Sequence, residues 1–228
     1  MKAFAIAIPT SKVSMAGFEE LKESYDKYGH EEGIELFEAI DVYKVDGYSS
    51  GNGLEWNYPW EGSQIDIATG LTKTAYPTAD KRKRISCFLG HWYLWQKCKS
   101  LNEMILILEH DAVLVGEIPQ LQMFDILSFG KPSYGKFNTP KFIGYGSLVS
   151  KPYFPGAHAY SITPKGAQEL IDESLHSAGP TDIFIHSSKF TLGEYYPWPV
   201  EARDSFTTIQ RKEGCWAKHN YGETYEII

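Results

Sequence analysis

The segment that most constrains the fold is 104–109, in which five apolar residues (MILIL) run directly into Glu109. A continuous apolar run of this length is typical of a central strand whose two faces are both covered. Strands and helices also alternate through the first half of the chain. Together these features predict an α/β fold with a mostly parallel sheet and helices on both faces.

Two acids, Glu109 and Asp111, stand at the end of this strand. In an extended chain alternate side chains share a face, so both acids point one way and His110 points the other. Buried carboxylates repel one another unless a cation lies between them, and oxygen ligands suit Mg²⁺ or Mn²⁺. Ligands of α/β sheets bind beyond the carboxyl ends of strands. The alternative is that the two acids simply begin a turn, which Asp111 caps.

The remaining pattern predicts further elements along the chain. Residues 41–81 and the last fifty residues are predicted to be largely irregular, with aromatic loops at 56–62 and 194–200. Strands are expected at 3–9, 34–40, 141–150 and 157–163, and helices at 17–28, at 84–99 and from 164 to about 179.

Length and composition bound the class of protein. The 228 residues suit a single domain, 1–228, with two halves at about 1–115 and about 116–228. A balance of 22 basic and 29 acidic residues disfavours nonspecific nucleic-acid binding. Three cysteines without metal-type spacing suit a reducing compartment. With no transmembrane stretch or secretory signal, a cytoplasmic location is expected.

Three ordered blocks of sequence resemble glycosyltransferase family 25, the lipopolysaccharide and collagen sugar transferases. The strongest is ISCFLGHWYLWQKCKSLNEMILILEHDAVL at 85–114. The others are FEAID at 37–41 and GAHAYSITPKGAQELI at 156–171. Several positions depart from the family pattern: His110 replaces its middle acid, Ser86-Cys87 its Gly-Cys, and Gly90-His91 its Ser-His. The Asn-Leu and Arg usual near the first strand are also replaced here, by Ala-Ile-Pro-Thr at 7–10.

This resemblance implies a GT-A type fold, a UDP-sugar donor, a divalent metal (Mn²⁺ or Mg²⁺) and inversion at the sugar carbon. Glu109 and Asp111 would hold the metal, and Asp111 would thereby take part in catalysis. His219 is the available imidazole for a third metal ligand; a surface histidine is the alternative.

A carboxylate must also take the proton of the acceptor hydroxyl. Asp182 in PTDIFIH is the expected base, because it matches the family's late P-x-D segment; the alternative is an N-cap after Pro180 and Thr181. Glu201 and Asp204 are held in reserve.

Other residues are expected around the donor. Arg84 and His91, on one stripe of the 84–99 helix, are placed at the diphosphate or the sugar; the alternatives are a solvated arginine and a histidine bonded within the fold. The remaining expectations are Thr10 and Asp41 for the uridine, and Gly156 and His158 near the donor sugar or acceptor.

The leading hypothesis is therefore a hexosyl- or pentosyltransferase that acts on a hydroxyl acceptor. The acceptor is a glycan or, given the KRKR run at 81–84, a hydroxymethylated base in phage-type DNA. Two rivals stay open: a noncatalytic carbohydrate- or nucleotide-binding module of the same fold, supported by His110, and a metal-dependent phosphohydrolase.

Overall fold

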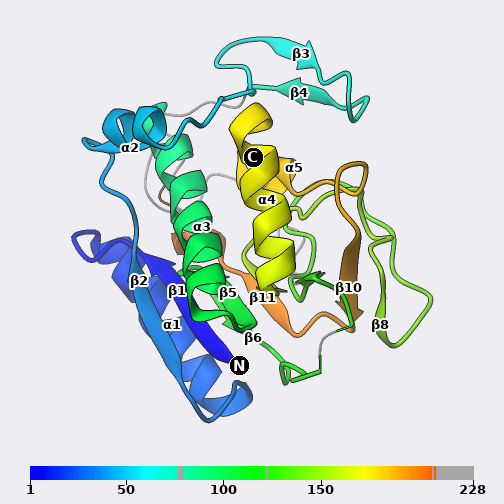
Figure 1. Ribbon diagram of the computed structural model, residues 1–228. Coiled ribbons are helices and arrows are strands. Elements are labelled where there is room, and N and C mark those ends of the chain that lie inside the picture. Colours follow the sequence, from blue (N-terminus) through cyan, green and yellow to red (C-terminus); the bar gives the residue numbers. More distant parts are fainter. Residues whose placement is uncertain (76–79, 122, 207, 209–228) are drawn as a thin grey trace.

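The computed structural model describes residues 1–75, 80–121, 123–206 and 208. Six strands and helices precede the long central helix, and the second half of the chain is richer in short strands (Figure 1). The elements in chain order are β1 Lys2–Ala7, α1 Lys12–Tyr28, β2 Ile34–Glu38, α2 Val45–Gly51, β3 Ser63–Ile65, β4 Thr72–Thr74, α3 Arg82–Leu101, β5 Ile105–Glu109, β6 Ala112–Leu114, β7 Ile126–Ser128, β8 Gly144–Ser147, β9 Ala159–Ile162, α4 Pro164–Ser177, α5 Thr181–Phe184, β10 Leu192–Tyr196 and β11 Val200–Ala202, followed by a 3-10 turn at Asp204–Phe206.

Seven strands form the main sheet in the order β2-β1-β5-β9-β7-β10-β8. Strands β2, β1 and β5 pair in parallel, and β7 pairs in parallel with β10. Strands β9 and β8 run against their neighbours, so five of the seven strands share one direction. The predicted mostly parallel α/β sheet is confirmed, and the arrangement is consistent with a GT-A-like fold.

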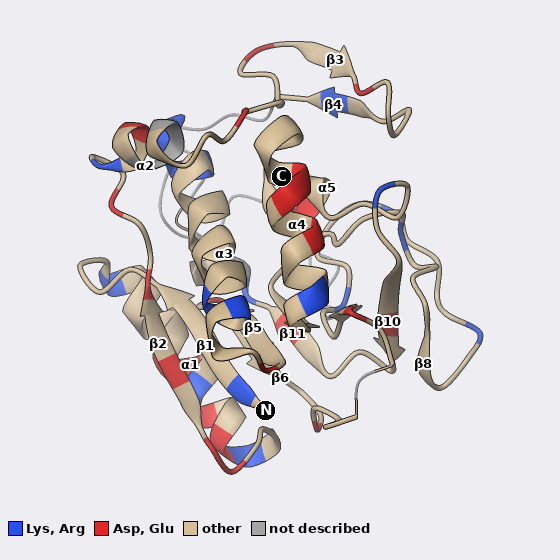
Figure 2. Cartoon of the chain, in the orientation of Figure 1, with Lys and Arg blue, Asp and Glu red and all other residues tan. Residues whose placement is uncertain are grey.

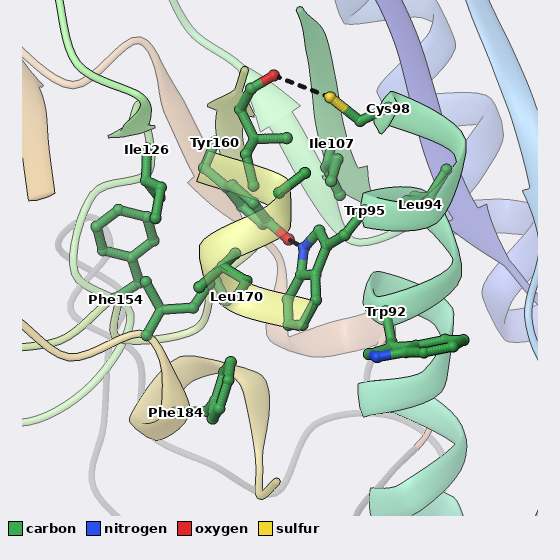
Figure 3. Close-up of a cluster of buried hydrophobic side chains, with 14 of the residues drawn as sticks. Trp92, Leu94, Trp95, Cys98, Ile107, Ile126, Phe154, Tyr160, Leu170 and Phe184 are labelled. Atoms are coloured by element: carbon green, nitrogen blue, oxygen red, sulfur yellow. Dashed lines mark hydrogen bonds between the residues drawn. The ribbon is translucent and has the colours of Figure 1, made fainter. Parts of the chain in front are cut away.

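Helices cover both faces of this sheet. On one face α3 and α4 lie side by side, with α5 beneath them, over the apolar side chains of β5 and β9 (Figures 1 and 3). On the other face α1 packs Phe18, Leu21 and Tyr25 against β1, β5 and β6. The side chains of β5 alternate between the two layers, because Ile105 and Ile107 join the first and Leu106 and Leu108 the second. This explains why the strand is apolar throughout.

Local sequence explains where the main helices begin. Helix α1 starts five residues before the predicted position, because the Ser11 hydroxyl accepts a hydrogen bond from the Ser14 amide. Helix α4 starts at Pro164 as predicted, with the Thr163 hydroxyl accepting from the Gly166 amide. The predicted helix at 84–99 extends over Arg82–Leu101 and ends at Asn102, whose backbone is left-handed.

The prediction of a largely irregular C-terminal region was wrong for its first part. Strand β10 lies inside the main sheet between β7 and β8, and β11 pairs with β6. Strands β6 and β7, the short helix α2 and the β3–β4 hairpin were also missed. These elements are three to seven residues long, so none carries enough periodicity to be recognised before its partner is known.

Candidate active site at the end of the central strand

The carboxyl ends of three adjacent parallel strands bring distant residues to one edge of the sheet. Glu109 ends β5 and lies opposite Ile6 of β1, and its amide donates to the carbonyl of His158, just before β9, at 2.9 Å. Thr10 follows β1 in a turn, and Asp41 follows β2, where its carboxylate accepts from the Tyr43 amide at 2.9 Å. Both side chains are exposed at this edge. The expected uridine residues thus lie where ligands of α/β sheets bind; their role stays a prediction.

The Glu109 carboxyl is largely buried, with 19% of its side chain exposed. Its Oε1 lies 2.9 Å from His91 Nε2 and 3.7 Å from the Cys87 sulfur. Burial raises the pKa of Glu109 to about 7, with a further upward contribution from the charge of Asp182. An acid whose pKa lies near neutrality inside a fold is a common property of functional sites.

A chain of hydrogen bonds from the core holds this carboxyl. The Trp95 indole donates to the Tyr160 hydroxyl at 2.8 Å (Figure 3). The Tyr160 hydroxyl lies 2.9 Å from His91 Nδ1. Because an indole can only donate, the tyrosine proton is directed to His91 Nδ1, and Nε2–H then donates to Glu109. Burial lowers the pKa of His91 to about 3, which keeps the ring neutral.

His91 is therefore a partner of Glu109 in this structure. Its side chain has no exposed surface, and both ring nitrogens are engaged within the fold. This geometry matches the alternative of a histidine bonded within the fold rather than the expected contact with the diphosphate or sugar. The i, i+4 spacing of Cys87 and His91 on α3 places both above the end of β5.

Asp111 lies in the tight turn that connects β5 to β6. The backbone of this turn is fixed from two sides, because the His110 amide donates to the Ile6 carbonyl at 3.1 Å and the Arg203 amide donates to the Asp111 carbonyl at 2.8 Å. The His110 ring turns to the Phe206 carbonyl, 2.9 Å away. Gly17 permits this packing, since a Cβ there would stand 2.7 Å from the His110 carbonyl oxygen.

Asp182 faces the same region from α5. Its Oδ2 accepts a hydrogen bond from the Tyr134 hydroxyl at 2.5 Å, and burial raises its pKa. It is not an N-cap, because Pro180 occupies that position and Asp182 bonds the adjacent Ile183 amide instead. The charge of Asp182 also contributes to the raised pKa of Glu109. Burial is the largest cause of the raised pKa of the Cys87 thiol, and the charges of Glu109, Asp182 and Asp111 raise it further. The three acids thus share one electrostatic environment.

Gly156 and His158 lie beside β9, next to Glu109. The backbone of Gly156 has φ +98°, and a Cβ there would stand 2.3 Å from the Ser133 hydroxyl oxygen, so only glycine fits. The His158 ring is buried against Gly130, where a Cβ would approach its Nε2 to 2.6 Å. Both residues therefore pack the wall of the site, and contact with a sugar stays a prediction.

Arg84 is buried rather than solvated. Its guanidinium lies over the rings of Tyr58 and Trp60, 5.7 Å from each centroid. Its neighbour Arg82 is paired with Asp80 at 2.7 Å. The 81–84 run consequently forms no continuous exposed basic stripe in the part of the chain that the structure describes.

Glu201 and Asp204 are the alternative candidates for the base, and both lie near the C-terminal end of the described residues. Glu201 on β11 is paired with Lys131 at 3.0 Å and with Arg203 at 3.3 Å. The Asp204 backbone begins the 3-10 turn. The predicted ligand His219 lies outside the described residues.

The donor atoms at this edge suit a divalent cation. Three carboxyl groups act electrostatically on one partly buried region, and a cation there would offset their mutual repulsion. Among the described residues, the tightest candidate group is Cys87, His91 and Glu109, whose donor atoms lie within 4.8 Å of one another. Asp111 is not part of that group. Sequence reasoning missed the part of Cys87, which the i, i+4 spacing to His91 could have indicated.

Fold and site together define an α/β protein with an acidic cluster at the carboxyl edge of its sheet. Comparison with known proteins defines the family. The model of the family described as glycosyltransferase family 25 (LPS biosynthesis protein) matches residues 22–185, and the chain belongs to that family.

A curated relative is the "Glycosyltransferase 25 family member" of Aedes aegypti, 28% identical over 114 residues. The match covers 44% of this chain and 19% of the mosquito protein, so the chain spans about a fifth of that relative's length. None of the helices in the described residues combines the length and apolar character needed to span a membrane.

Proposed function

We propose that the protein is a metal-dependent glycosyltransferase that moves a hexose or pentose from a UDP-sugar to a hydroxyl acceptor, with inversion at the sugar carbon. The observation that carries this proposal is the group of Glu109, Asp111 and Asp182 at the carboxyl edge of β5. Buried acids with raised pKa values at this edge suit a reaction in which a charged leaving group departs and a proton is removed.

In this proposal Glu109 and Asp111 hold Mn²⁺ or Mg²⁺, with His219 as a further candidate. The bound ion would supply positive charge that stabilises the departing diphosphate. His91 keeps the Glu109 carboxyl oriented through its Nε2–H, so its part is positioning. Thr10 and Asp41 line the same edge of the sheet and are proposed for the uridine.

Asp182 is proposed as the base that accepts the acceptor's proton. Its raised pKa makes it a better proton acceptor near neutrality than an exposed aspartate, and the Tyr134 hydroxyl fixes its orientation. A single displacement with one base inverts the configuration at the sugar carbon. NMR assignment of the product anomer, with a donor of known configuration, tests that part.

The decisive experiment measures UDP release from UDP-sugars in the presence and absence of Mn²⁺. We expect metal-dependent release that the Asp111→Asn variant loses, while Asp26→Asn on the exposed side of α1 keeps it. Parallel reactions with Mg²⁺ and Zn²⁺ test whether oxygen ligands or the Cys87 group select the ion. Absence of nucleotide release with every UDP-sugar, in a folded protein that binds UDP, would favour the noncatalytic module.

A glycan hydroxyl is the proposed acceptor. A hydroxymethylated base in DNA would need an exposed basic track, and in the 81–84 run Arg84 is buried and Arg82 is paired. Retention on DNA-cellulose that falls steeply with salt would reopen that route. A phosphohydrolase would instead release phosphate from simple esters without nucleotide preference.

A further inference from the structure

A polar groove of about 540 Å³ opens beside the acidic site. One wall is formed by residues 136–138 and the other by residues 148–153, with Ser187 closing the set. These walls are tied together, because the Asn138 amide donates to the Ser150 carbonyl at 2.9 Å. The groove is therefore bounded by backbone that is hydrogen-bonded across it, and its volume falls in the range of small-ligand sites.

The fold holds these walls rigidly from beneath. Glu194 of β10 is fully buried, and its Oε1 accepts from the amides of Val149 and Ser150 at 2.7 and 2.8 Å. Its Oε2 accepts from the Trp198 indole at 3.1 Å, and the Trp198 ring packs edge-on against Phe137 of the opposite wall. A single buried carboxylate thus organises both sides of the groove.

The charge of the groove is opposite to that of the whole chain. Among the residues described as lining it, Lys136 and Lys151 are basic and none is acidic, in a protein with net charge −7. Figure 2 shows basic positions on the loops beside β8 and β10, whereas acidic positions gather on α1 and α4. The serine and asparagine residues and Tyr153 add polar groups that suit a hydroxylated ligand, and the remaining lining residues, Phe137, Leu148, Val149 and Pro152, are apolar.

Lys151 connects the groove to Asp182. Its Nζ lies 3.3 Å from the Tyr153 hydroxyl and over the rings of Tyr134 and Tyr153, at 5.0 and 5.1 Å from their centroids. Tyr134 in turn bonds Asp182. Burial lowers the pKa of Lys151, and the charge of Asp182 opposes that shift, so the two groups are near enough to interact. A bound anion beside Lys151 would accept charge-assisted hydrogen bonds from its ammonium group, in place of the water molecules that burial removes.

We propose that this groove is the acceptor subsite and that it takes a sugar carrying an anionic group, either a phosphate ester or a carboxylate, which Lys136 and Lys151 bind. The inference rests on the proposed transferase function and specifies its acceptor class. The Tyr153 hydroxyl and the serine and asparagine side chains of the walls hydrogen-bond the sugar hydroxyls, and the acceptor hydroxyl is directed to Asp182.

The reaction balances with the groups already named. The acceptor hydroxyl oxygen forms the new bond to the anomeric carbon of the donor sugar. The bond from that carbon to the diphosphate oxygen breaks, and its electron pair leaves with UDP. The hydroxyl proton passes to Asp182.

Binding of glucose 6-phosphate, glucuronate and uncharged glucose is tested by saturation-transfer NMR, and binding of inorganic phosphate by the broadening of its ³¹P line. We expect glucose 6-phosphate or glucuronate to bind, with glucose and phosphate each much weaker, and we expect added salt to weaken binding. Comparison of the two charged sugars distinguishes a phosphate from a carboxylate ligand. The double variant Lys136→Gln/Lys151→Gln should raise the Kd at least about tenfold, since it removes two charge-assisted contacts. Lys22→Gln, on the exposed side of α1, is the matched control.

Three results would overturn the proposal: glucose binding as tightly as both charged sugars, inorganic phosphate binding as tightly as glucose 6-phosphate, or an unchanged Kd in the double variant. Lys136→Gln alone, at an exposed position, keeps the test valid should the double variant unfold. UDP binding by the wild-type protein is measured separately. Absence of UDP binding counts against the transferase function. UDP binding without binding of either charged sugar counts against the groove alone.

Discussion

Two buried glutamates on the same sheet differ in how many hydrogen-bond donors the fold gives to each carboxylate. Glu194 on β10 is fully buried and accepts three N–H groups, from Val149, Ser150 and Trp198. Glu109 on β5 is largely buried as well, yet its recorded partners within the described residues are the ring of His91 and the weak thiol donor of Cys87.

The difference lies in how fully each carboxylate is solvated by the protein. Three N–H donors replace the hydrogen bonds to water that Glu194 loses on burial, and through them this acid organises the loops around it. Glu109 has fewer donors and shares its surroundings with Asp182, and its pKa is raised to about 7. A buried carboxylate with few hydrogen-bond donors around it can be stabilised in its charged form by a ligand that carries positive charge.

The largest expected effect follows from replacing the reactive acid. Glu109→Gln should lower turnover by about 10³-fold, because it removes charge from the proposed metal centre while the His91 contact is retained. Steady-state assay of UDP release measures this. Full activity in Glu109→Gln would show that the reaction does not depend on the Glu109 carboxylate.

The second prediction concerns the pH dependence of stability. Between the ordinary pKa of 4.5 and the folded value of about 7, folded protein keeps a proton on Glu109 that unfolded protein has lost. The free energy of unfolding of the wild type should therefore fall, relative to Glu109→Gln, as pH rises through this window, by on the order of 3 kcal/mol.

Urea unfolding of both proteins without metal, from pH ~4 to pH ~8, measures this difference. The penalty should be absent below the unfolded pKa and complete above the folded one. Parallel stability curves for the two proteins would mean that Glu109 is as well solvated as Glu194.

The third prediction concerns the structural acid. Glu194→Gln should lower the free energy of unfolding by about 2 kcal/mol, because the amide group cannot accept at every N–H that the carboxylate satisfies. Glu35→Gln, on exposed β2, is the control and should change it by less than about 0.5 kcal/mol. Chemical denaturation at fixed pH measures both. If both variants changed the free energy of unfolding equally little, the three N–H groups bonded to Glu194 would contribute no more to stability than the contacts of a surface glutamate.

The smallest expected effect lies in the hydrogen-bond chain behind Glu109. Tyr160→Phe removes the oxygen that links Trp95 to His91, and should cost about 1–2 kcal/mol of stability. It should also shift the pH window of the Glu109 titration, which carboxyl ¹³C NMR follows directly. Tyr28→Phe on α1 is the control. A destabilised variant with an unmoved Glu109 pKa would make Tyr160 a packing residue only.

The sequence determined the central strand and its acids, because both depend on local pattern. An unbroken apolar run ending in Glu109 indicates a strand buried on both faces, and the long helices were indicated by spacing and by Thr163-Pro164. The strand ends also placed Thr10, Asp41 and Glu109 at one edge of the sheet. Each of these inferences needs only a few neighbouring residues.

Tertiary structure alone decided how Glu109 and Glu194 differ. The sequence predicted Glu109 at the end of a strand and Glu194 in a loop. The hydrogen-bond partners of these acids include residues 18 and 45 positions away, respectively. It also decided that His91 faces inward, that Asp182 bonds Tyr134, and that Lys136 and Lys151 line one groove. The physical reason is that desolvation and hydrogen bonding depend on what surrounds a group in space, and chain order does not specify those surroundings until the sheet has formed.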